Sequence, residues 1–90
     1  METLSPRIRR RIERDFPEPV STAEAVALVE SASTQERVRA AVVISAAGDL
    51  TRLRAAVRLA ETDWRDAIVG AGLGDENWPT VLDAQFGPSA

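Results

Sequence analysis

Apolar residues recur along most of the chain at intervals of three and four positions, which is the spacing of one face of an α-helix. The alternation of apolar and polar residues that is typical of a half-buried strand is absent. Several separate runs carry the helical spacing, and turn-forming residues lie between them. The pattern predicts an all-α fold, a compact bundle of five to six short helices in a single domain.

The first predicted helix runs from about Pro6 to Asp15, because Ser5 is a capping residue and proline is favoured in the first helical position. Its apolar residues are four apart and form a narrow stripe that we expect to pack on the bundle. The core anchors predicted from this stripe are Ile8, Ile12 and Phe16.

Pro17 and Pro19 disfavour helical geometry at the residues before them and predict a stiff connector after the first helix. This break divides the chain into a basic amphipathic helix with its connector at residues 1–19 and a helical core at residues 20–87. We expect residues 88–90 to form a disordered tail.

Two predicted helices follow, and each opens with a serine and a glutamate three positions later. Ser21 with Glu24 begins the second helix, and Ser33 with Glu36 begins the third, which ends near Gly48. In such a capping box each side chain satisfies a backbone N–H group that the helix start leaves free. The third helix is apolar on nearly all sides, so it is predicted to be the central element.

The fourth and fifth predicted helices each begin at a polar capping residue. Asp49 caps the fourth, which runs to about Glu61, and Thr62 or Asp63 caps a short fifth helix. Trp64 lies next to this cap, and apolar residues three, four and seven positions later continue its face. Trp64 is therefore predicted to be a structural anchor in the core.

The fifth helix is followed by the glycine run Gly70-Ala-Gly-Leu-Gly. A dinucleotide-binding fingerprint needs a preceding strand and a different spacing, so this run is predicted to be a helix end and a turn. A sixth helix begins at Asp75 or Asn77 and ends at Gly87. Trp78 lies at its start, and the sequence leaves open whether this side chain is buried or meets a partner.

Charge is distributed unevenly along the chain, which has a net charge of −3. Residues 1–14 hold five arginines and two glutamates, a net charge of +3, whereas residues 61–90 hold one arginine and six acids, a net charge of −5. The first helix either folds back with its arginines in water or serves as an exchanged or partner-binding arm. The candidate interaction surface is formed by Arg7, Arg10, Arg11, Arg14 and Trp78.

The composition argues against most enzyme chemistry, because the chain has no His, Cys, Lys or Tyr. The usual general bases and activated nucleophiles are therefore missing, and we predict no catalytic, cofactor-binding or metal site and no small-molecule substrate. Asp63, Asp66, Asp75, Glu76 and Asp83 do not match an EF-hand loop. Most of them fall in the first turn of a predicted helix, where carboxylates cap free N–H groups.

Several short motifs lie between Glu36 and Asp83. They are Glu36-Arg-Val-Arg-Ala-Ala-Val-Val, Gly48-Asp-Leu, Thr62-Asp-Trp-Arg-Asp, Ala71-Gly-Leu, and Trp78-Pro with Leu82-Asp83. Across these motifs the chain resembles a group of small uncharacterised helical proteins of high-GC bacteria. The resemblance covers about half of the chain and implies a helical fold, but it implies no activity.

These observations predict a non-catalytic protein that acts in protein interaction or self-association, with a homodimer as one form. The alternative is a nucleic-acid-associated regulator that uses the arginine-rich first helix, although an acidic domain lacks the usual electrostatic footprint. No secretory signal is visible, and the longest uncharged apolar run, at residues 40–47, is shorter than the roughly 20 residues that span a bilayer. We therefore expect a cytoplasmic protein without a membrane partner.

Overall fold

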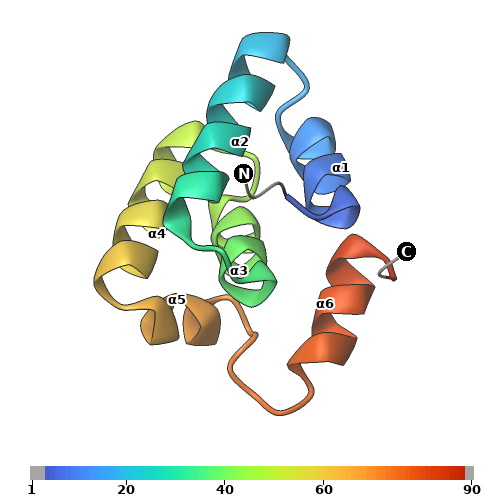
Figure 1. The fold of residues 1–90 in the computed structure, drawn as a ribbon, viewed down its shortest axis with the longest axis vertical. Helices are drawn as coiled ribbons and strands as arrows, with labels where there is room; N and C mark the ends of the chain where they lie inside the picture. Colours follow the sequence, from blue (N-terminus) through green and yellow to red (C-terminus); the bar gives the residue numbers. More distant parts are fainter. Residues whose placement is uncertain (1–3, 89–90) are drawn as a thin grey trace.

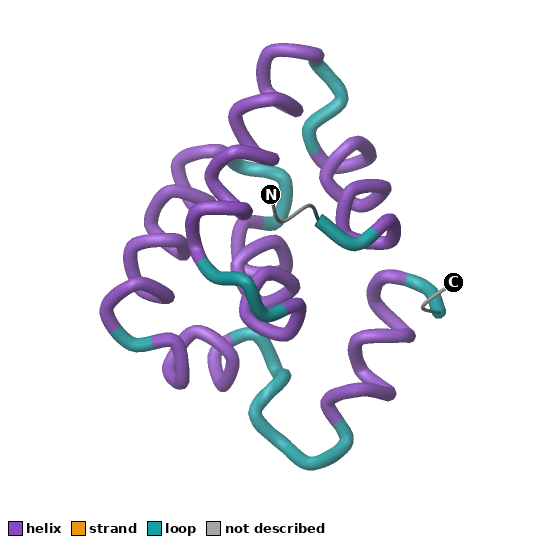
Figure 2. Tube along the Cα trace, in the orientation of Figure 1, coloured by secondary structure: helices purple, strands orange, loops and turns teal. Residues whose placement is uncertain are grey.

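The computed structural model describes residues 4–88, which form six α-helices and no strand (Figures 1 and 2). The helices are α1 Pro6–Asp15, α2 Pro19–Ala32, α3 Glu36–Ala46, α4 Leu50–Thr62, α5 Trp64–Gly70 and α6 Trp78–Phe86. They fold into one body that measures 35 × 30 × 26 Å, which confirms the predicted all-α single-domain bundle. Within residues 4–88, every helix is too short or too polar to cross a bilayer.

Helix α3 lies at the centre of the bundle, as its nearly continuous apolar sequence predicts. It contacts α1, α2, α4 and α5, and Figure 1 shows α4 on one side of it and α1 and α6 on the other. The apolar residues that α3 buries are Val38, Ala40, Ala41, Val42, Val43 and Ala46. Many of these side chains are small, so the neighbouring helices can approach α3 closely.

Helix α1 folds back onto the bundle and packs against α2, α3 and α6. Its predicted anchors are buried together with Leu4, and Ile8 and Ile12 are wholly inaccessible to solvent. Phe16, just after the helix, is 3% exposed. The division of the chain at residue 19 stays a prediction, and residues 89–90 of the predicted tail lie outside the described part of the chain.

Short-range signals place several helix ends where the sequence predicts them. The carboxylate of Asp49 accepts a hydrogen bond from the backbone N–H of Arg52 at the start of α4. The carboxylate of Asp63 accepts one from the backbone N–H of Asp66 at the start of α5. Gly87, with φ of +84°, ends α6 in a conformation that favours glycine.

The two predicted capping boxes do not form, because both glutamates bind arginines on other helices. Glu36 accepts hydrogen bonds from Arg7 of α1, and Glu24 pairs with Arg54 of α4. Helix α2 begins at Pro19, and Glu18 occupies its N-cap position, three residues before the predicted cap Ser21. Ser33 is left outside α3, where its hydroxyl accepts a hydrogen bond from the backbone N–H of Gln35.

Candidate functional site

The first candidate surface is the arginine cluster of α1, and its central member is not accessible. Arg7 is only 7% exposed, and its Nε and Nη2 atoms donate to the two carboxylate oxygens of Glu36 at 3.0 and 2.9 Å. Its Nη1 atom donates to Asp83 Oδ1 at 2.5 Å and to the carbonyl oxygen of Gly87 at 3.0 Å. The prediction that Arg7 faces a partner is therefore wrong, because Arg7 joins α1 to α3 and α6.

Electrostatics reinforce this role of Arg7. Its hydrogen bonds to Glu36 raise the pKa of the Arg7 guanidinium above its ordinary value. The same bonds hold the pKa of the Glu36 carboxyl below its ordinary value. Both groups are therefore charged at neutral pH, and each stabilises the charge of the other.

Arg11 is also engaged inside the molecule. Its Nε atom donates to Asp15 Oδ2 at 3.0 Å, and its Nη1 atom donates to the carbonyl oxygen of Gln85 at 2.8 Å. The guanidinium carbon lies 5.1 Å from the centre of the Phe86 ring. Arg11 therefore satisfies a carbonyl at the end of α6, where the helix dipole favours a positive charge.

Arg10 and Arg14 are the two members of the cluster that stay exposed. Arg14 is 71% exposed and lies 3.5 Å from Asp15, and Arg10 makes no ion pair within residues 4–88. Together with Arg7 and Arg11 they line a hollow of about 290 Å³ at the end of α6. The predicted basic surface is thus divided into two internal and two accessible arginines.

Trp78, the remaining predicted surface residue, is half-buried against the core at the start of α6. The guanidinium carbon of Arg37 lies 4.9 Å from the centre of its ring. Arg37 also donates from Nε and Nη2 to the carbonyl oxygen of Leu73, at 2.9 and 2.6 Å. Arg37 therefore covers one face of Trp78 and ties α3 to the loop before α6.

Trp64 is not the core anchor that the sequence predicts, since its side chain is 43% exposed. The same face of α5 does bury Ala67 and Ile68, so the predicted orientation of the helix holds. Trp64 is the first residue of α5, however, and residues 61–66 are all exposed at this corner of the bundle. The Arg65 guanidinium carbon lies 5.2 Å from its ring centre.

A hollow of about 300 Å³ lies between α3, α4 and α5, and we call it the α4–α5 groove. Its lining residues are Val42 and Ser45 of α3, Arg52, Ala55, Ala56 and Leu59 of α4, and Ala67 of α5. Leu59 is 43% exposed, although it is a large apolar side chain. The groove thus combines an apolar floor with an exposed leucine and one arginine.

Sequence reasoning missed the α4–α5 groove, although α4 carries a signal for it. The inward residues of α4 include Leu53 and Val57, which are buried. Leu59 lies off this stripe, and a second row of positions at 52, 55, 56 and 59 runs beside it with the same helical spacing. The second row becomes a groove only because α3 and α5 supply its other walls.

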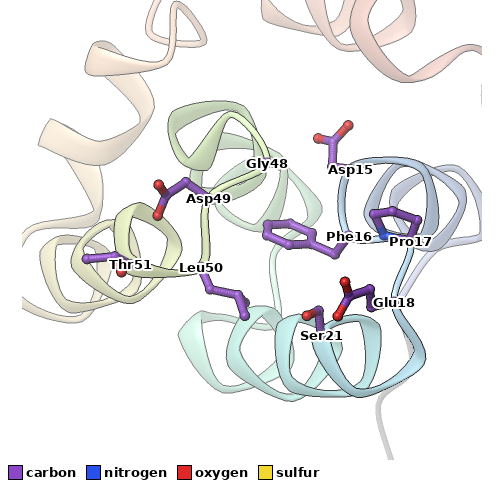
Figure 3. Close-up of a pocket in the computed structure, with 9 residues that line it drawn as sticks. All are labelled: Asp15, Phe16, Pro17, Glu18, Ser21, Gly48, Asp49, Leu50 and Thr51. Atoms are coloured by element: carbon purple, nitrogen blue, oxygen red, sulfur yellow. The ribbon is translucent and has the colours of Figure 1, made fainter.

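A third hollow, of about 400 Å³, lies between the starts of α2 and α4 (Figure 3). Asp15, Glu18 and Asp49 surround the ring of Phe16 in this view. Asp49 caps α4, and Asp15 binds Arg11, so two of the three acids already have partners. Within residues 4–88 no group of three or more acidic side chains is placed to hold a metal ion.

Comparisons with protein-family models, with curated proteins and with solved structures gave no match for this chain. The resemblance to small helical proteins of high-GC bacteria therefore stays a prediction.

Proposed function

We propose that this protein is a non-catalytic interaction module that binds another protein molecule through the α4–α5 groove. The observation that carries the proposal is an exposed large apolar side chain in this groove, Leu59, together with a second one, Trp64, on the neighbouring helix α5; each is 43% accessible. Leu59 lines the groove directly. Trp64 lies one helical turn before the lining residue Ala67, and therefore on the same face of α5.

Single exposed apolar residues are normal on a protein surface and need no explanation. Here one of them lines a concave surface whose remaining walls are mostly small and apolar, and the other lies one helical turn from a residue of that lining. Binding sites combine these properties: a hollow, an apolar lining and a few polar groups that fix orientation. Ser45 and Arg52 are the polar groups of this groove.

Trp64 has the properties of an interaction anchor. Tryptophan is enriched among the residues that dominate binding energy, because it buries a large area and loses little conformational freedom. The guanidinium carbon of Arg65 lies 5.2 Å from the ring centre, within the range of a cation–π contact. Together these features favour Trp64, rather than Trp78, as the aromatic contact with a partner.

The contacts of the arginine cluster favour the nucleic-acid alternative less than the distribution of charge along the sequence does. Arg7 and Arg11 are engaged with carboxylates and carbonyls of the same chain, which leaves Arg10 and Arg14 of the four for phosphate contacts. Fewer accessible arginines mean fewer phosphate contacts, and such contacts supply essentially all non-specific binding to nucleic acid. Retention on random-sequence duplex DNA at low salt would revive this alternative.

A site-specific photo-cross-linker tests the proposed function. The photoreactive residue replaces Leu59 in one variant and Val20 in a control variant, because Val20 is 79% exposed but lies at the start of α2, outside the groove. On irradiation in the source cells, we expect a defined cross-linked protein from position 59 only. The substitution Ala55→Glu, which places a charge in the groove, should abolish that product.

Two results would contradict the proposal. One is the absence of any defined product from position 59. The other is an identical set of products from positions 59 and 20, which would indicate random collision. Circular dichroism of the Ala55→Glu variant shows whether it is folded; Ala55 is exposed on α4, so the helix accommodates glutamate.

A further inference from the structure

The shape and charge of the α4–α5 groove also point to the kind of partner. We propose that the groove receives one short amphipathic helix that carries two apolar side chains on one face and a carboxylate beside them. This inference rests on the proposed function, and it names the occupant of the same site.

The length of the groove matches two turns of a helix. Its row on α4 extends from Arg52 to Leu59, seven positions further on, which corresponds to about 10 Å along a helix axis. Two apolar side chains four to seven positions apart on a ligand helix lie about 6 to 10 Å apart along its axis, so both fit within this length. The row between these ends consists of Ala55 and Ala56, whose short side chains allow a ligand backbone to approach α4 closely.

The volume of the groove limits how many side chains it can accept. It measures about 300 Å³. A buried apolar cavity of about 150 Å³ holds one benzene molecule, so this groove accommodates about two side chains of leucine or phenylalanine size. A flat protein surface would leave the hollow unfilled. A polar ligand would lose the water around its polar groups next to alanine and valine side chains, which cannot replace those hydrogen bonds.

Charge at the edge of the groove supplies the second part of the specificity. Arg52 lines the groove and makes no ion pair within residues 4–88, whereas Arg54 on the same helix is paired with Glu24. A carboxylate on the ligand helix, one turn from an apolar anchor, can reach the guanidinium of Arg52. A lysine or arginine at that position would be repelled.

A second copy of this chain fits the groove less well than a foreign helix. The large apolar residues with exposed side chains within residues 4–88 are Val20, Leu59, Trp64 and Val69. Leu59, Trp64 and Val69 belong to α4 and α5, so outside these two helices a copy can offer the groove only Val20, without a second anchor.

The exposed apolar surface beside the groove is also small for a dimer interface. A stable dimer commonly buries about 800 Å² on each partner. Two exposed side chains beside a 300 Å³ hollow supply only the apolar centre for a smaller, single-helix contact.

Titration with designed peptides tests the occupant. The probe is a synthetic helical peptide with leucines at positions i and i+4 and glutamates flanking them, and the matched control has lysines in place of the glutamates. Backbone amide shifts of the full-length protein should move for residues of α4 and α5. We expect the glutamate peptide to bind about fivefold more tightly than the lysine peptide, the upper range for one exposed ion pair.

Variants of the protein measure the contribution of charge to peptide binding separately from that of the shape of the groove. Arg52→Glu should reverse the preference between the two peptides. Arg58→Glu is the control, because Arg58 lies on the same helix but does not line the groove, and it should preserve the preference. Added salt should reduce the preference, because the ion pair is exposed. Light scattering of the free protein should give the mass of a monomer.

The outcomes distinguish the inference from the proposed function. If both peptides leave the amide shifts unchanged while the cross-link at position 59 is present, the groove binds a protein but the helical occupant is wrong. If the protein is a dimer whose interface includes Leu59, a second copy is the occupant and the inference is likewise overturned. Equal binding of both peptides would refute the role of Arg52.

Discussion

Arg7 of α1 and Glu36 of α3 form a bidentate ion pair, with both carboxylate oxygens bound at 2.9 to 3.0 Å across 29 positions of sequence. The guanidinium also reaches Asp83 and the carbonyl of Gly87, so a single side chain links three helices. A planar guanidinium can do this because its five donors are arranged in a fixed fork. Lysine at the same position could not bind these groups in the same geometry.

Removal of Arg7 should destabilise the fold. In Arg7→Ala the largely buried side chain is lost, and Glu36 and Asp83 lose the cation that compensates them. Because both carboxylates keep some contact with water, we expect the free energy of unfolding to fall by about 2 kcal/mol. Urea denaturation followed by circular dichroism measures this change.

The matched control for that experiment is Arg10→Ala. Arg10 lies on the same helix, is exposed and makes no ion pair within residues 4–88. Its removal should change the unfolding free energy by less than about 0.5 kcal/mol. An equal loss of unfolding free energy in both variants would show that the contacts of Arg7 with the three helices contribute no more than one positive charge on α1.

The stability of the protein should depend on pH through Glu36. Its hydrogen bonds to Arg7 lower the pKa of this carboxyl from the ordinary value of 4.5. The pKa of Glu36 is thus lower in the folded chain than in the unfolded chain, and between these two values the unfolded chain binds more protons. The stabilisation that Glu36 contributes is therefore present above pH 4.5 and is lost as the pH falls through the folded pKa.

The test compares unfolding free energies of the wild type and Glu36→Gln between neutral and acidic pH. The wild type should lose more stability than the variant as the pH falls below 4.5. Glutamine has no carboxyl group to protonate, so its curve keeps only the slope from other acids. Parallel curves for the two proteins would contradict the prediction.

Trp64 should contribute little to stability, in contrast with what its position in the sequence predicts. Since 43% of Trp64 is exposed, Trp64→Ala should lower the unfolding free energy by only about 1 to 2 kcal/mol. Phe16→Ala should cost about 3 to 5 kcal/mol, because Phe16 is 3% exposed and its loss leaves a cavity. Thermal denaturation of both variants shows which substitution lowers stability more. A larger loss of stability for Trp64→Ala than for Phe16→Ala would refute the assignment of Trp64 to a free surface.

Arg37 should hold Trp78 and the loop before α6 in place. In Arg37→Ala the carbonyl of Leu73 loses its donor and Trp78 loses the guanidinium that covers its ring, a cost of about 1 to 2 kcal/mol. With Trp64 replaced by phenylalanine, fluorescence reports Trp78 alone, and its emission should shift to longer wavelength as water reaches the ring. Arg65→Ala, which uncovers only an exposed tryptophan, should leave stability nearly unchanged.

The parts of the fold that could be predicted from the sequence depend on interactions between near neighbours. Asp49 and Asp63 cap their helices through N–H groups three residues away, and Pro6 occupies the first position of α1. Such signals act within a few residues, so they can be identified without knowledge of the rest of the molecule. The apolar spacing of α3 likewise defines a central helix before its neighbours are known.

The errors arise where distant parts of the chain meet. Glu24 and Glu36 have the spacing of capping boxes, but α1 and α4 bring arginines within reach, and the stronger charge-assisted bonds replace the caps. The same pairing buries Arg7, which the charge pattern alone places in water. The α4–α5 groove was missed for a related reason, since its walls come from three helices.

The bond between Arg7 and Asp83 spans 76 positions, nearly the whole length of the chain. During synthesis α1 leaves the ribosome long before α6, so for most of that time Arg7 lacks Asp83 and the carbonyl of Gly87. Contacts of such long sequence separation form late, because the intervening chain must first be ordered. We therefore expect α1 and α6 to dock in the last step of folding, after α6 has left the ribosome.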